Sequence, residues 1–299
     1  MSMRSFIREE EYTGVIGNTE RRALKYKLVY AAVIALLICV CIITLFPTLW
    51  VAMSAFKSTK EYLQVPPTIF PKTFEPEKLV KVLEKVKIGK YLKSSVIIIA
   101  LSWFSSVVFN GLAGYSFAKL KPTGSNLLYR AIFITMLMPT SMNMIPLYMT
   151  FTEFPIGGVN LINTYVPMFM LTGISCFNIM LFKNFFAAIP TELLEAARLD
   201  GAGELRIFTK IILPMSRPII SVVSIFSING AWSSFFWPFL TLKKEGMKPV
   251  SVLLYSMASV LREDEYMVLM LVAIIPPLII FLIFQKKIMG GINVGGVKG

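Results

Sequence analysis

The sequence predicts an all-α membrane protein with six transmembrane helices and both termini in the cytoplasm, and three observations lead to this prediction. Hydrophobic residues make up 56% of the chain and charged residues only 16%, whereas soluble domains carry roughly 25% charged residues. Six apolar stretches are long enough to cross a bilayer. The basic residues gather in the segments between these stretches, as they do beside membrane spans.

The six stretches follow one another along the chain. A bilayer core about 30 Å thick needs about 20 apolar residues in a helix. The stretches that meet this requirement are Leu28–Met53, Ser94–Ala118, Ala131–Thr150, Leu161–Phe182, Pro218–Leu240 and Tyr266–Phe284. The first belongs to an uncharged run that reaches Phe56, which is longer than the roughly 7–15 residues of a signal-peptide core. We therefore expect a retained first span rather than a cleaved leader.

The segments outside the spans define the expected domain boundaries. We expect a six-span membrane domain over residues 28–285, an N-terminal arm over 1–27 and a glycine-rich tail over 286–299. An even number of spans places the arm, the tail and the loop 189–217 on one side. Among the arginines, only Arg262 then falls on the opposite side. Because basic residues concentrate in cytoplasmic loops, we expect both termini and the loop 189–217 in the cytoplasm.

The largest expected outer element is the loop over residues 54–93, between the first two spans. From residue 76 to 88, apolar residues recur at i, i+3, i+4 and i+7, which predicts an amphipathic helix. These residues are Leu79, Val82, Leu83 and Val86. Two roles stay open for this helix, since it could cap the spans or receive an external partner.

The residue inventory argues against catalysis and cofactor binding by this chain. It has no histidine, which is the commonest general base and the commonest metal ligand. Cys39 and Cys41 would point about 200° apart on a helix and could not share a metal. The nearest approach to a phosphate-binding loop, residues 291–298, has its lysine one position late and no hydroxyl residue after it. We therefore expect no catalytic residue, metal or cofactor in this chain.

The charge distribution argues against two further classes of protein. The net charge of +13 comes from short segments rather than one basic face, which favours contact with membrane lipid over nucleic acid. No predicted span contains Asp, Glu, Lys, Arg or His, although carriers driven by proton or voltage gradients usually need such a residue. Sodium-coupled carriers can use backbone carbonyls instead, so their exclusion is weaker. We therefore expect the energy for any transport to come from another protein.

The loop 189–217 interrupts the apolar sequence with a polar, sharply turned segment. Pro190 and Glu192 suit the first turn of a short helix. Its expected narrow apolar face consists of Leu193, Leu194, Ala196 and Ala197. Gly201 can adopt the positive φ that often ends a helix, so we expect a sharp turn there.

A second helix is expected after Gly201, completing a helix–glycine–helix that Pro214 and Pro218 should end. Its apolar side would consist of Leu205, Phe208, Ile211 and Ile212. Such a segment could simply pack on the protein's own spans at the membrane surface. Glu195 and Asp200 favour a partner instead, because acidic groups near an anionic leaflet are electrostatically unfavourable without one.

The same segment resembles a known family. The run Glu195-Ala196-Ala197-Arg198-Leu199-Asp200-Gly201-Ala202, followed by Phe208, Ile211, Leu213 and Pro214, resembles the EAA loop of permease subunits of binding-protein-dependent ABC importers. Further landmarks resemble the carbohydrate branch of the maltose-transporter type, namely Phe56-Lys57-Ser58, Pro66-Pro67 with Pro71, Leu112-Ala113-Gly114-Tyr115-Ser116-Phe117-Ala118, Trp237-Pro238 and the ending Gly295-Gly296-Val297-Lys298-Gly299. The ending is similar to that of the second, shorter permease of the heterodimeric pair. The chain has Trp232-Ser233 where the family often has Trp-Asn, and Ser94-Ser95 where it often has Asn-Ser.

The resemblance implies a multi-pass permease subunit of a bacterial cytoplasmic membrane, which imports a sugar or oligosaccharide by alternating access. Its EAA loop would form a coupling helix seated in a cleft of a cytoplasmic ATPase subunit. The implied coupling residues are Glu195, Ala196, Ala197, Asp200 and Gly201. The implied partners are a homologous second permease, two ATPase subunits, an external solute-binding protein and membrane lipid. ATP and Mg²⁺ would be bound by the ATPase subunits, and this chain itself would hydrolyse nothing.

A substrate path is expected among the polar and aromatic residues of the third to fifth spans. The candidates are Asn143, Asn178, Asn229, Trp232, Ser233 and Phe236. Each could instead serve interhelical packing and hydrogen bonding. Other functions also stay open: an ATP-independent facilitator or channel, an ABC permease for a solute other than sugar, and an assembly or sensory protein that moves no solute.

Overall fold

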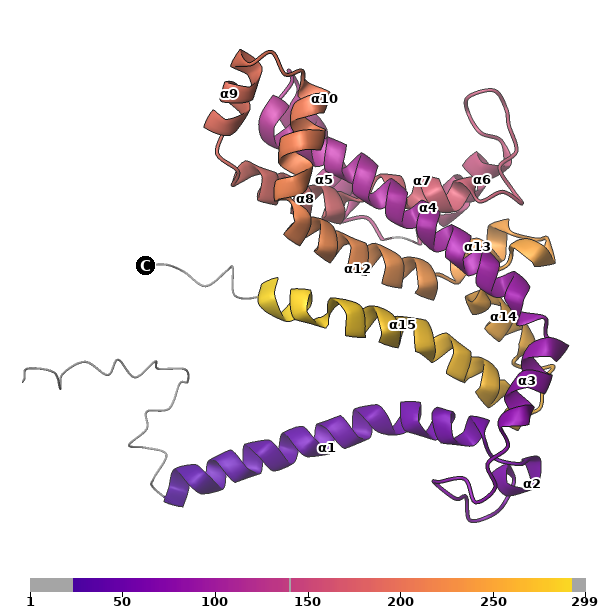
Figure 1. Cartoon of the computed structure of the whole chain (residues 1–299). Helices are drawn as coiled ribbons and strands as arrows, with labels where there is room; N and C mark the ends of the chain where they lie inside the picture. Colours follow the sequence, from indigo (N-terminus) through magenta and orange to yellow (C-terminus); the bar gives the residue numbers. More distant parts are fainter. Residues whose placement is uncertain (1–23, 140, 292–299) are drawn as a thin grey trace, which may run out of the picture.

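Every regular element in the described part of the chain is a helix. The computed structural model describes residues 24–139 and 141–291. Figure 1 shows its four longest helices, which are α1 (Leu24–Ala55), α4 (Ile88–Tyr115), α12 (Arg217–Ser233) and α15 (Glu263–Gly291). The shorter helices are α2 (Thr59–Tyr62), α3 (Pro76–Lys85), α5 (Ser125–Thr135), α6 (Met144–Thr152), α7 (Val166–Gly173), α8 (Cys176–Ala187), α9 (Glu192–Leu199), α10 (Glu204–Ile207), α11 (Leu213–Met215), α13 (Phe236–Thr241) and α14 (Val250–Met257). The all-α class is therefore confirmed.

The described helices provide three to five candidate membrane spans. Three stretches, residues 27–55, 88–120 and 263–285, are each long and apolar enough to cross a membrane. Two bent pairs pass the same test together: α7 with α8, at 46°, and the segment Glu204–Met215 with α12, at 82°. By length and composition, residues 24–139 and 141–291 form a multi-spanning helical protein.

The predicted span Ala131–Thr150 is not a single helix. It covers parts of α5 and α6, which are separated by a turn through Pro139. Proline lacks an amide hydrogen and disfavours helical geometry in the residue before it. Hydropathy does not register this effect, so the apolar stretch looked continuous in the sequence.

Two other predicted spans are also interrupted. Leu161–Phe182 breaks between α7 and α8, where the Ser175 hydroxyl caps α8 by accepting a hydrogen bond from the Asn178 amide at 3.4 Å. Pro218–Leu240 ends its long helix at Ser233 and resumes as α13. The broken helices place polar side chains and free backbone groups in the middle of apolar sequence, which matters for the site below.

The amphipathic helix expected over residues 76–88 is present as α3, and its apolar side is buried. Val82 is only 2% exposed. It packs in one cluster with Leu79, Leu83, Val86, Val268 and Leu269. This packing of α3 on the beginning of α15 fits the role of capping the spans.

A buried ion pair ties α3 to α15. The Lys78 Nζ lies 3.5 Å from the Asp264 Oδ2, and the two side chains are only 9% and 2% exposed. The same Nζ donates a hydrogen bond to the backbone carbonyl of Lys57 at 2.7 Å, and the Thr59 hydroxyl donates to Asp264 at 3.0 Å. Burial lowers the pKa of Lys78, and Asp264 offsets part of that effect.

Glu61 organises the loop between α2 and α3. Its carboxylate accepts hydrogen bonds from the backbone amides of Lys72 at 2.7 Å and Thr73 at 3.1 Å, and from the Thr68 hydroxyl at 2.8 Å. These donors, the Lys72 amide first, lower the pKa of Glu61 from 4.5 to about 2. The charged form of Glu61 therefore holds the loop in place.

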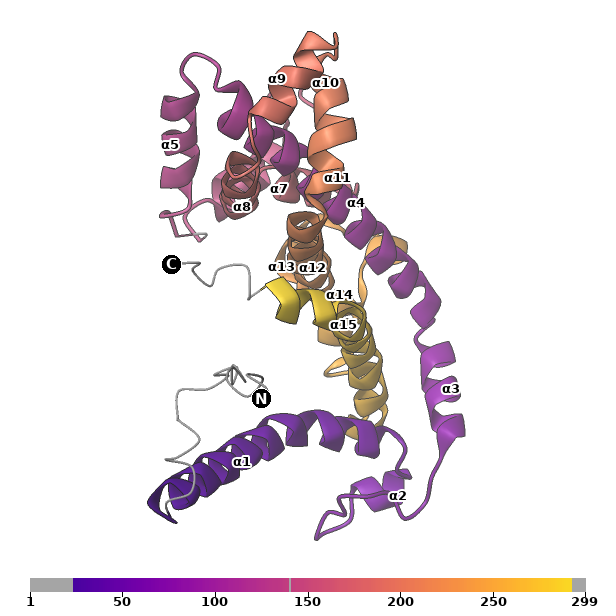
Figure 2. The ribbon, with the colours of Figure 1, turned by 60° about the vertical axis from the view of Figure 1, so that its left-hand side comes forward.

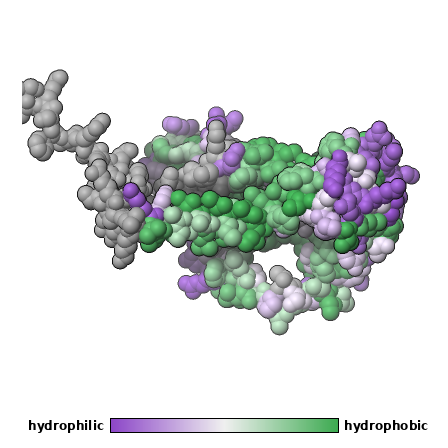
Figure 3. Space-filling view, turned by 90° about the horizontal axis from the view of Figure 1, so that it is seen from below, coloured by the Kyte–Doolittle hydropathy of each residue, from purple (hydrophilic) through white to green (hydrophobic). Residues whose placement is uncertain are grey.

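The helix α1 diverges from the rest of the bundle along most of its length. Figures 1 and 2 show that it approaches α15 only toward the end that leads into α2. Its apolar side chains, among them Leu36, Ile43 and Leu49, are more than half exposed. Figure 3 shows apolar residues across the middle of the molecule and polar residues gathered at the end where α2 and α3 lie. A surface of this kind needs lipid or protein to cover it.

Candidate functional site

The expected helix–glycine–helix is present, and we call residues 190–215 the elbow. Its first limb is α9 and its second limb begins with α10. Between them Gly201 has φ +80°, and the Ala202 amide donates to the Ala197 carbonyl at 2.9 Å. A Cβ added at Gly201 would meet no heavy atom within 4 Å. The glycine is therefore required by the backbone conformation, which costs other residues about 1–2 kcal/mol, and not by space.

The second limb runs without a break from α10 through a π-helical turn, Phe208–Ile212, into α11. It ends at Met215, between the two prolines, Pro214 and Pro218, that were expected to end it. Pro214 is the next-to-last residue of this helix, where the loss of one amide donor interrupts little of the helical hydrogen bonding. The chain then bends by 82° into α12 at the buried Ser216, whose hydroxyl donates to the Ile212 carbonyl at 2.6 Å.

Leu205 was expected on the buried side of this limb, and that expectation is wrong. Leu205 is 71% exposed, whereas Ile207 is completely buried and Phe208 is 5% exposed. At 100° per residue, Leu205 lies about 200° around the helix from Ile207. The buried side is centred on Ile207, so Leu205 points away from it.

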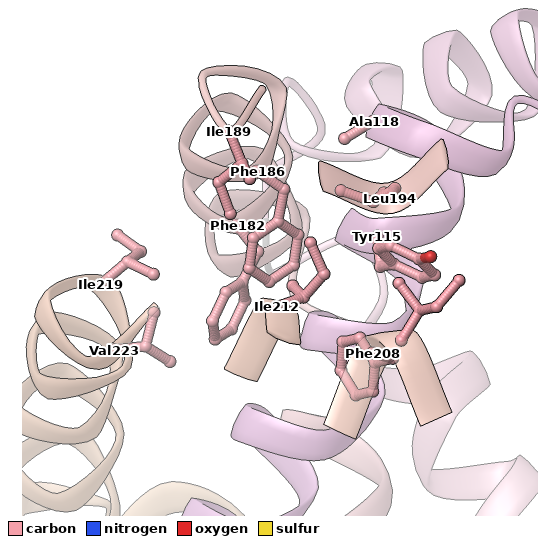
Figure 4. Close-up of a cluster of buried hydrophobic side chains, with 11 residues drawn as sticks. Tyr115, Ala118, Phe182, Phe186, Ile189, Leu194, Phe208, Ile212, Ile219 and Val223 are labelled. Atoms are coloured by element: carbon pink, nitrogen blue, oxygen red, sulfur yellow. The ribbon is translucent and has the colours of Figure 1, made fainter. Parts of the chain in front are cut away.

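The elbow is held on the bundle by a cluster of buried apolar side chains, which we call the elbow cluster (Figure 4). Its members are Tyr115, Ala118, Phe182, Phe186, Ile189, Leu194, Ile207, Phe208, Ile212, Ile219 and Val223. Leu194, on the first limb, is completely buried in it. The helices α4 and α8 meet very closely beside it, because a Cβ on Gly114 would lie 2.5 Å from the Phe182 Cβ. The elbow therefore rests on the packed ends of α4, α8 and α12.

Polar contacts join the end of α4 to both limbs of the elbow. The Tyr115 hydroxyl donates to Glu204 Oε2 at 2.7 Å, and the Arg198 Nε donates to Glu204 Oε1 at 2.7 Å. The Lys119 Nζ donates to the Ile189 carbonyl at 2.5 Å and to the Thr191 hydroxyl at 3.4 Å. One carboxylate thus links α4, α9 and α10.

The five expected coupling residues lie together on the elbow, and four of them are exposed. Glu195, Ala196, Asp200 and Gly201 are exposed, whereas Ala197 is half-buried against the elbow cluster. Within the described part of the chain, the Glu195 and Asp200 carboxylates make no hydrogen bond or ion pair. These carboxylates are therefore free to accept hydrogen bonds from another molecule.

The prediction missed two exposed leucines on the same surface. Leu199 is 89% exposed and Leu205 is 71% exposed. Both lie at the outer side of the elbow, next to Asp200 and Gly201 in sequence or across the turn. Leu199 stands outside the apolar face expected for its helix and could have been suspected from the sequence. Leu205 could not, because its spacing placed it on the expected apolar side. Together with the exposed carboxylates they form a surface that suits a protein partner.

The six candidates for the substrate path do not come together. Trp232 is buried in the cluster that holds α3 on α15, and its Nε1 donates to the Ala273 carbonyl at 3.1 Å, which is a packing role. Phe236 stacks edge-on against Trp237. Three further candidates, Asn143, Asn229 and Ser233, are exposed.

Of the six, Asn178 lines an open pocket, which has a volume of about 290 Å³. Its Nδ2 donates to the Ser106 hydroxyl at 2.8 Å, and the Ser227 hydroxyl lies 2.8 Å from the same oxygen. Thr172, Gly230 and the aromatic pair Phe177 and Phe226 also line this pocket. The serines of α4 and α12 could have been suspected from their presence in otherwise apolar helices. In residues 24–139 and 141–291, no cluster of His, Cys, Asp or Glu could hold a metal.

Comparison with known proteins agrees with this architecture. The family model described as "Binding-protein-dependent transport system inner membrane component" matches residues 110–291. The chain is 30% identical, over 87% of its length and 86% of the relative, to the diacetylchitobiose uptake system permease protein NgcG of Streptomyces coelicolor. It is 31% identical, over 93% of its length and 98% of the relative, to the glucose import system permease protein GlcU of Saccharolobus solfataricus.

Solved structures show the same fold. The chain superposes with a TM-score of 0.78, at 21% identity, on a chain of a bacterial ABC transporter involved in import of the acidic polysaccharide alginate, covering 92% of this chain and 99% of that one. A second alginate ABC transporter structure, in complex with an alginate pentasaccharide-bound periplasmic protein, matches with a TM-score of 0.52 at 15% identity over 88% and 93% of the two chains. The family model spans most of the chain, including the elbow, α12 and α15, and the protein therefore belongs to the family of binding-protein-dependent transport system inner membrane components.

Proposed function

We propose that this chain is the permease subunit of an ABC importer that moves a sugar or oligosaccharide across the cytoplasmic membrane by alternating access. The relatives named above are permeases of diacetylchitobiose and glucose systems, which supports a carbohydrate substrate. The observation that carries the proposal is the elbow itself. Leu194 is completely buried and anchors the elbow to the bundle, while Leu199 and Asp200 remain exposed for a partner.

The proposed topology has six spans, with both termini in the cytoplasm. It comprises the arm 1–27, the membrane domain 28–285 with the outer loop 54–93, and the tail 286–299; residues 1–23 and 292–299 lie outside the described structure. Figure 1 supports this topology, because the beginning of α1, the end of α15 and the elbow lie toward one side of the molecule. The capping helix α3 lies toward the other side.

The proposed partners are a second, homologous permease, two cytoplasmic ATPase subunits, an external solute-binding protein and the surrounding lipid. The ATPase subunits would bind ATP and Mg²⁺ and carry out hydrolysis, and the loop 189–217, which contains the elbow, would be the coupling loop. Glu195, Ala196, Asp200 and Gly201 would contact the ATPase, with Ala197 fixing the limb to the bundle. Closure of the ATPase dimer would then push both permeases' elbows and open the pair outward.

The substrate path is proposed to include Asn178 and to run through the pocket that it lines. Amide and hydroxyl groups there, from Asn178, Ser106 and Ser227, can exchange hydrogen bonds with sugar hydroxyls. Phe177 and Phe226 offer aromatic surface beside them. Asn143, Asn229, Ser233, Phe236 and Trp232 stay candidates for the path at or beyond the described pocket.

The test is whether the elbow docks an ATPase. In the purified importer, Leu199→Glu should abolish co-purification of the ATPase subunits, because it places a charge on the proposed docking surface. Leu63→Glu is the matched control, since Leu63 is 66% exposed and follows α2 at the far end of the molecule. Unchanged ATPase association in Leu199→Glu would overturn the coupling role. Sugar flux into proteoliposomes without any ATPase would instead support a facilitator or channel.

A further inference from the structure

The last residue of α4, Tyr115, and the π-helical turn that continues the helix, Ser116–Leu120, contact both limbs of the elbow from one side. Tyr115 and Lys119 are four residues apart, which places them on the same face of a helical segment. Tyr115 binds Glu204 at the start of the second limb, and Lys119 binds the Ile189 carbonyl at the entrance to the first limb. The elbow is thus connected to α4 as well as to α12, to which it is joined through the chain.

The contact through Tyr115 is the firmest of these connections. Tyr115 is only 3% exposed, and its ring packs on Phe208 with a centroid separation of 5.3 Å. The Arg198–Glu204 ion pair is 38% and 44% exposed, so by itself it contributes little. A buried hydroxyl that donates to a carboxylate is a charge-assisted hydrogen bond, which is stronger and more directional. Tyr115 therefore sets the position of Glu204 at the start of the second limb.

From the elbow, α4 runs as one unbroken helix past the open pocket that Asn178 lines. At mid-length, Ser106 accepts the hydrogen bond from Asn178 at the pocket wall. Nearby, Asn110 accepts from the Ser175 amide at 2.7 Å and donates to the Thr172 carbonyl at 3.1 Å, which fixes both sides of the break between α7 and α8. A movement of the end of α4 is therefore carried directly to the residues that line the pocket.

We propose that Tyr115 and Lys119 are positioning residues that clamp α4 to the elbow, so that displacement of the elbow moves α4 and the pocket wall together with α12. This inference rests on the proposed function, because it assumes that the elbow is the part that an ATPase moves. It adds a polar side-chain connection with α4 to the covalent connections with α8 and α12 and to the packing of the elbow cluster.

The experiment compares transport with ATP consumption in the complete importer reconstituted in proteoliposomes. Tyr115→Phe removes the hydroxyl and keeps the ring on Phe208. We expect the ATPase subunits to stay bound and to hydrolyse ATP, while sugar transported per ATP falls about fivefold or more, the lower end of typical coupling between sites. Tyr165→Phe is the matched control, because it removes a 3.0 Å hydroxyl contact with Ser94 at the other end of α4. Its transport per ATP should equal that of the unmodified importer.

Further variants at Glu204 and Lys119 separate a positioning role from a general loss of stability. If Tyr115 acts through Glu204, then Tyr115→Phe should cause no additional loss in a Glu204→Ala background. Lys119→Met should lower transport per ATP, and Lys119→Arg, which keeps a cationic donor, should restore it. A merely structural role would lower the amount of assembled importer and leave transport per ATP unchanged in whatever assembles.

The outcomes distinguish this inference from the proposed function. Unchanged transport per ATP in Tyr115→Phe, or a loss that is additive with Glu204→Ala, would overturn the clamp. Parallel loss of ATPase association and uptake would also overturn it, since Tyr115 would then serve docking only. Intact ATPase association in Leu199→Glu would overturn the proposed function, and the clamp with it.

Discussion

Three leucines of the elbow differ sharply in burial, and this difference predicts three different consequences of the same substitution. Leu194 is completely buried, Leu193 is 44% exposed and Leu199 is 89% exposed. Replacing a fully buried leucine by alanine costs about 2–5 kcal/mol, from lost burial and from the cavity left behind. Leu194 is completely buried within the elbow cluster, so we take about 3 kcal/mol, inside this range, for Leu194→Ala.

The two neighbours provide internal controls for this magnitude. For Leu193→Ala, roughly half of a side-chain burial of about 1.5–3 kcal/mol is lost and no closed cavity forms, which gives about 1 kcal/mol. Leu199→Ala removes almost no buried surface, so its cost should be near zero. All three substitutions remove the same atoms from adjacent turns of one short segment, and helix propensity changes little.

Hydrogen exchange of the amides of residues 192–200, in the purified permease pair without ATPase subunits, measures this cost, because no docked partner then covers Leu199. A loss of about 3 kcal/mol corresponds to about 100-fold more frequent local opening. We therefore expect fast exchange in Leu194→Ala, a small increase in Leu193→Ala and no change in Leu199→Ala. Equal exchange in Leu194→Ala and Leu199→Ala would refute the reasoning, because it would mean that burial of Leu194 does not hold the elbow on the bundle.

Two further predictions concern the opposite end of the molecule. Asp264→Ala leaves Lys78 buried without its counter-charge, which should destabilise the protein by roughly 3–5 kcal/mol, as measured by thermal unfolding in detergent. The double variant Lys78→Met with Asp264→Leu should recover most of this loss. If it recovers none, an unpaired buried charge is not the cause. For Glu61, the folded-state pKa of about 2 lies below the ordinary 4.5, so its stabilisation of the loop 63–75 is present above pH 4.5 and is lost as pH falls toward 2. Limited proteolysis by an acid-active protease should detect the loosened loop, and Glu61→Gln should remove the pH dependence; a pH dependence that persists in Glu61→Gln would assign it to another group.

Local sequence patterns predicted those parts of the fold that depend on residues close together in the chain. The spacing of Leu79, Val82, Leu83 and Val86 predicted α3, and Gly201 predicted the turn of the elbow, because periodicity and positive φ are local properties. The break through Pro139 was missed, since hydropathy counts apolar residues and ignores backbone geometry.

The candidate coupling surface on the elbow and its contacts with the bundle were predicted only in part. Asp200 and Glu195 could be identified from the sequence, because acidic groups beside an anionic membrane surface need a partner. The roles of Tyr115 and Glu204 depend on a contact between residues 89 positions apart, which exists only once α4, α8 and α12 have packed. Trp232 was one candidate for the substrate path, with packing as the alternative, and the contact of its indole with the Ala273 carbonyl on α15 could not be seen in the sequence.

Because the chain bends by 82° at Ser216, the second limb of the elbow lies nearly perpendicular to the axis of α12 and can act as a lever on it. At about 1.5 Å per residue, the limb from Glu204 to Met215 is about 18 Å long. A displacement of about 3 Å at the free end of this limb, perpendicular to the limb and to α12, would turn α12 by about 10° about its own axis if the two move as one body. Ser227 and Gly230 lie on α12 and line the pocket. Such a rotation would move them around the pocket rather than along it. A displacement of the elbow would thereby change which side chains face the pocket.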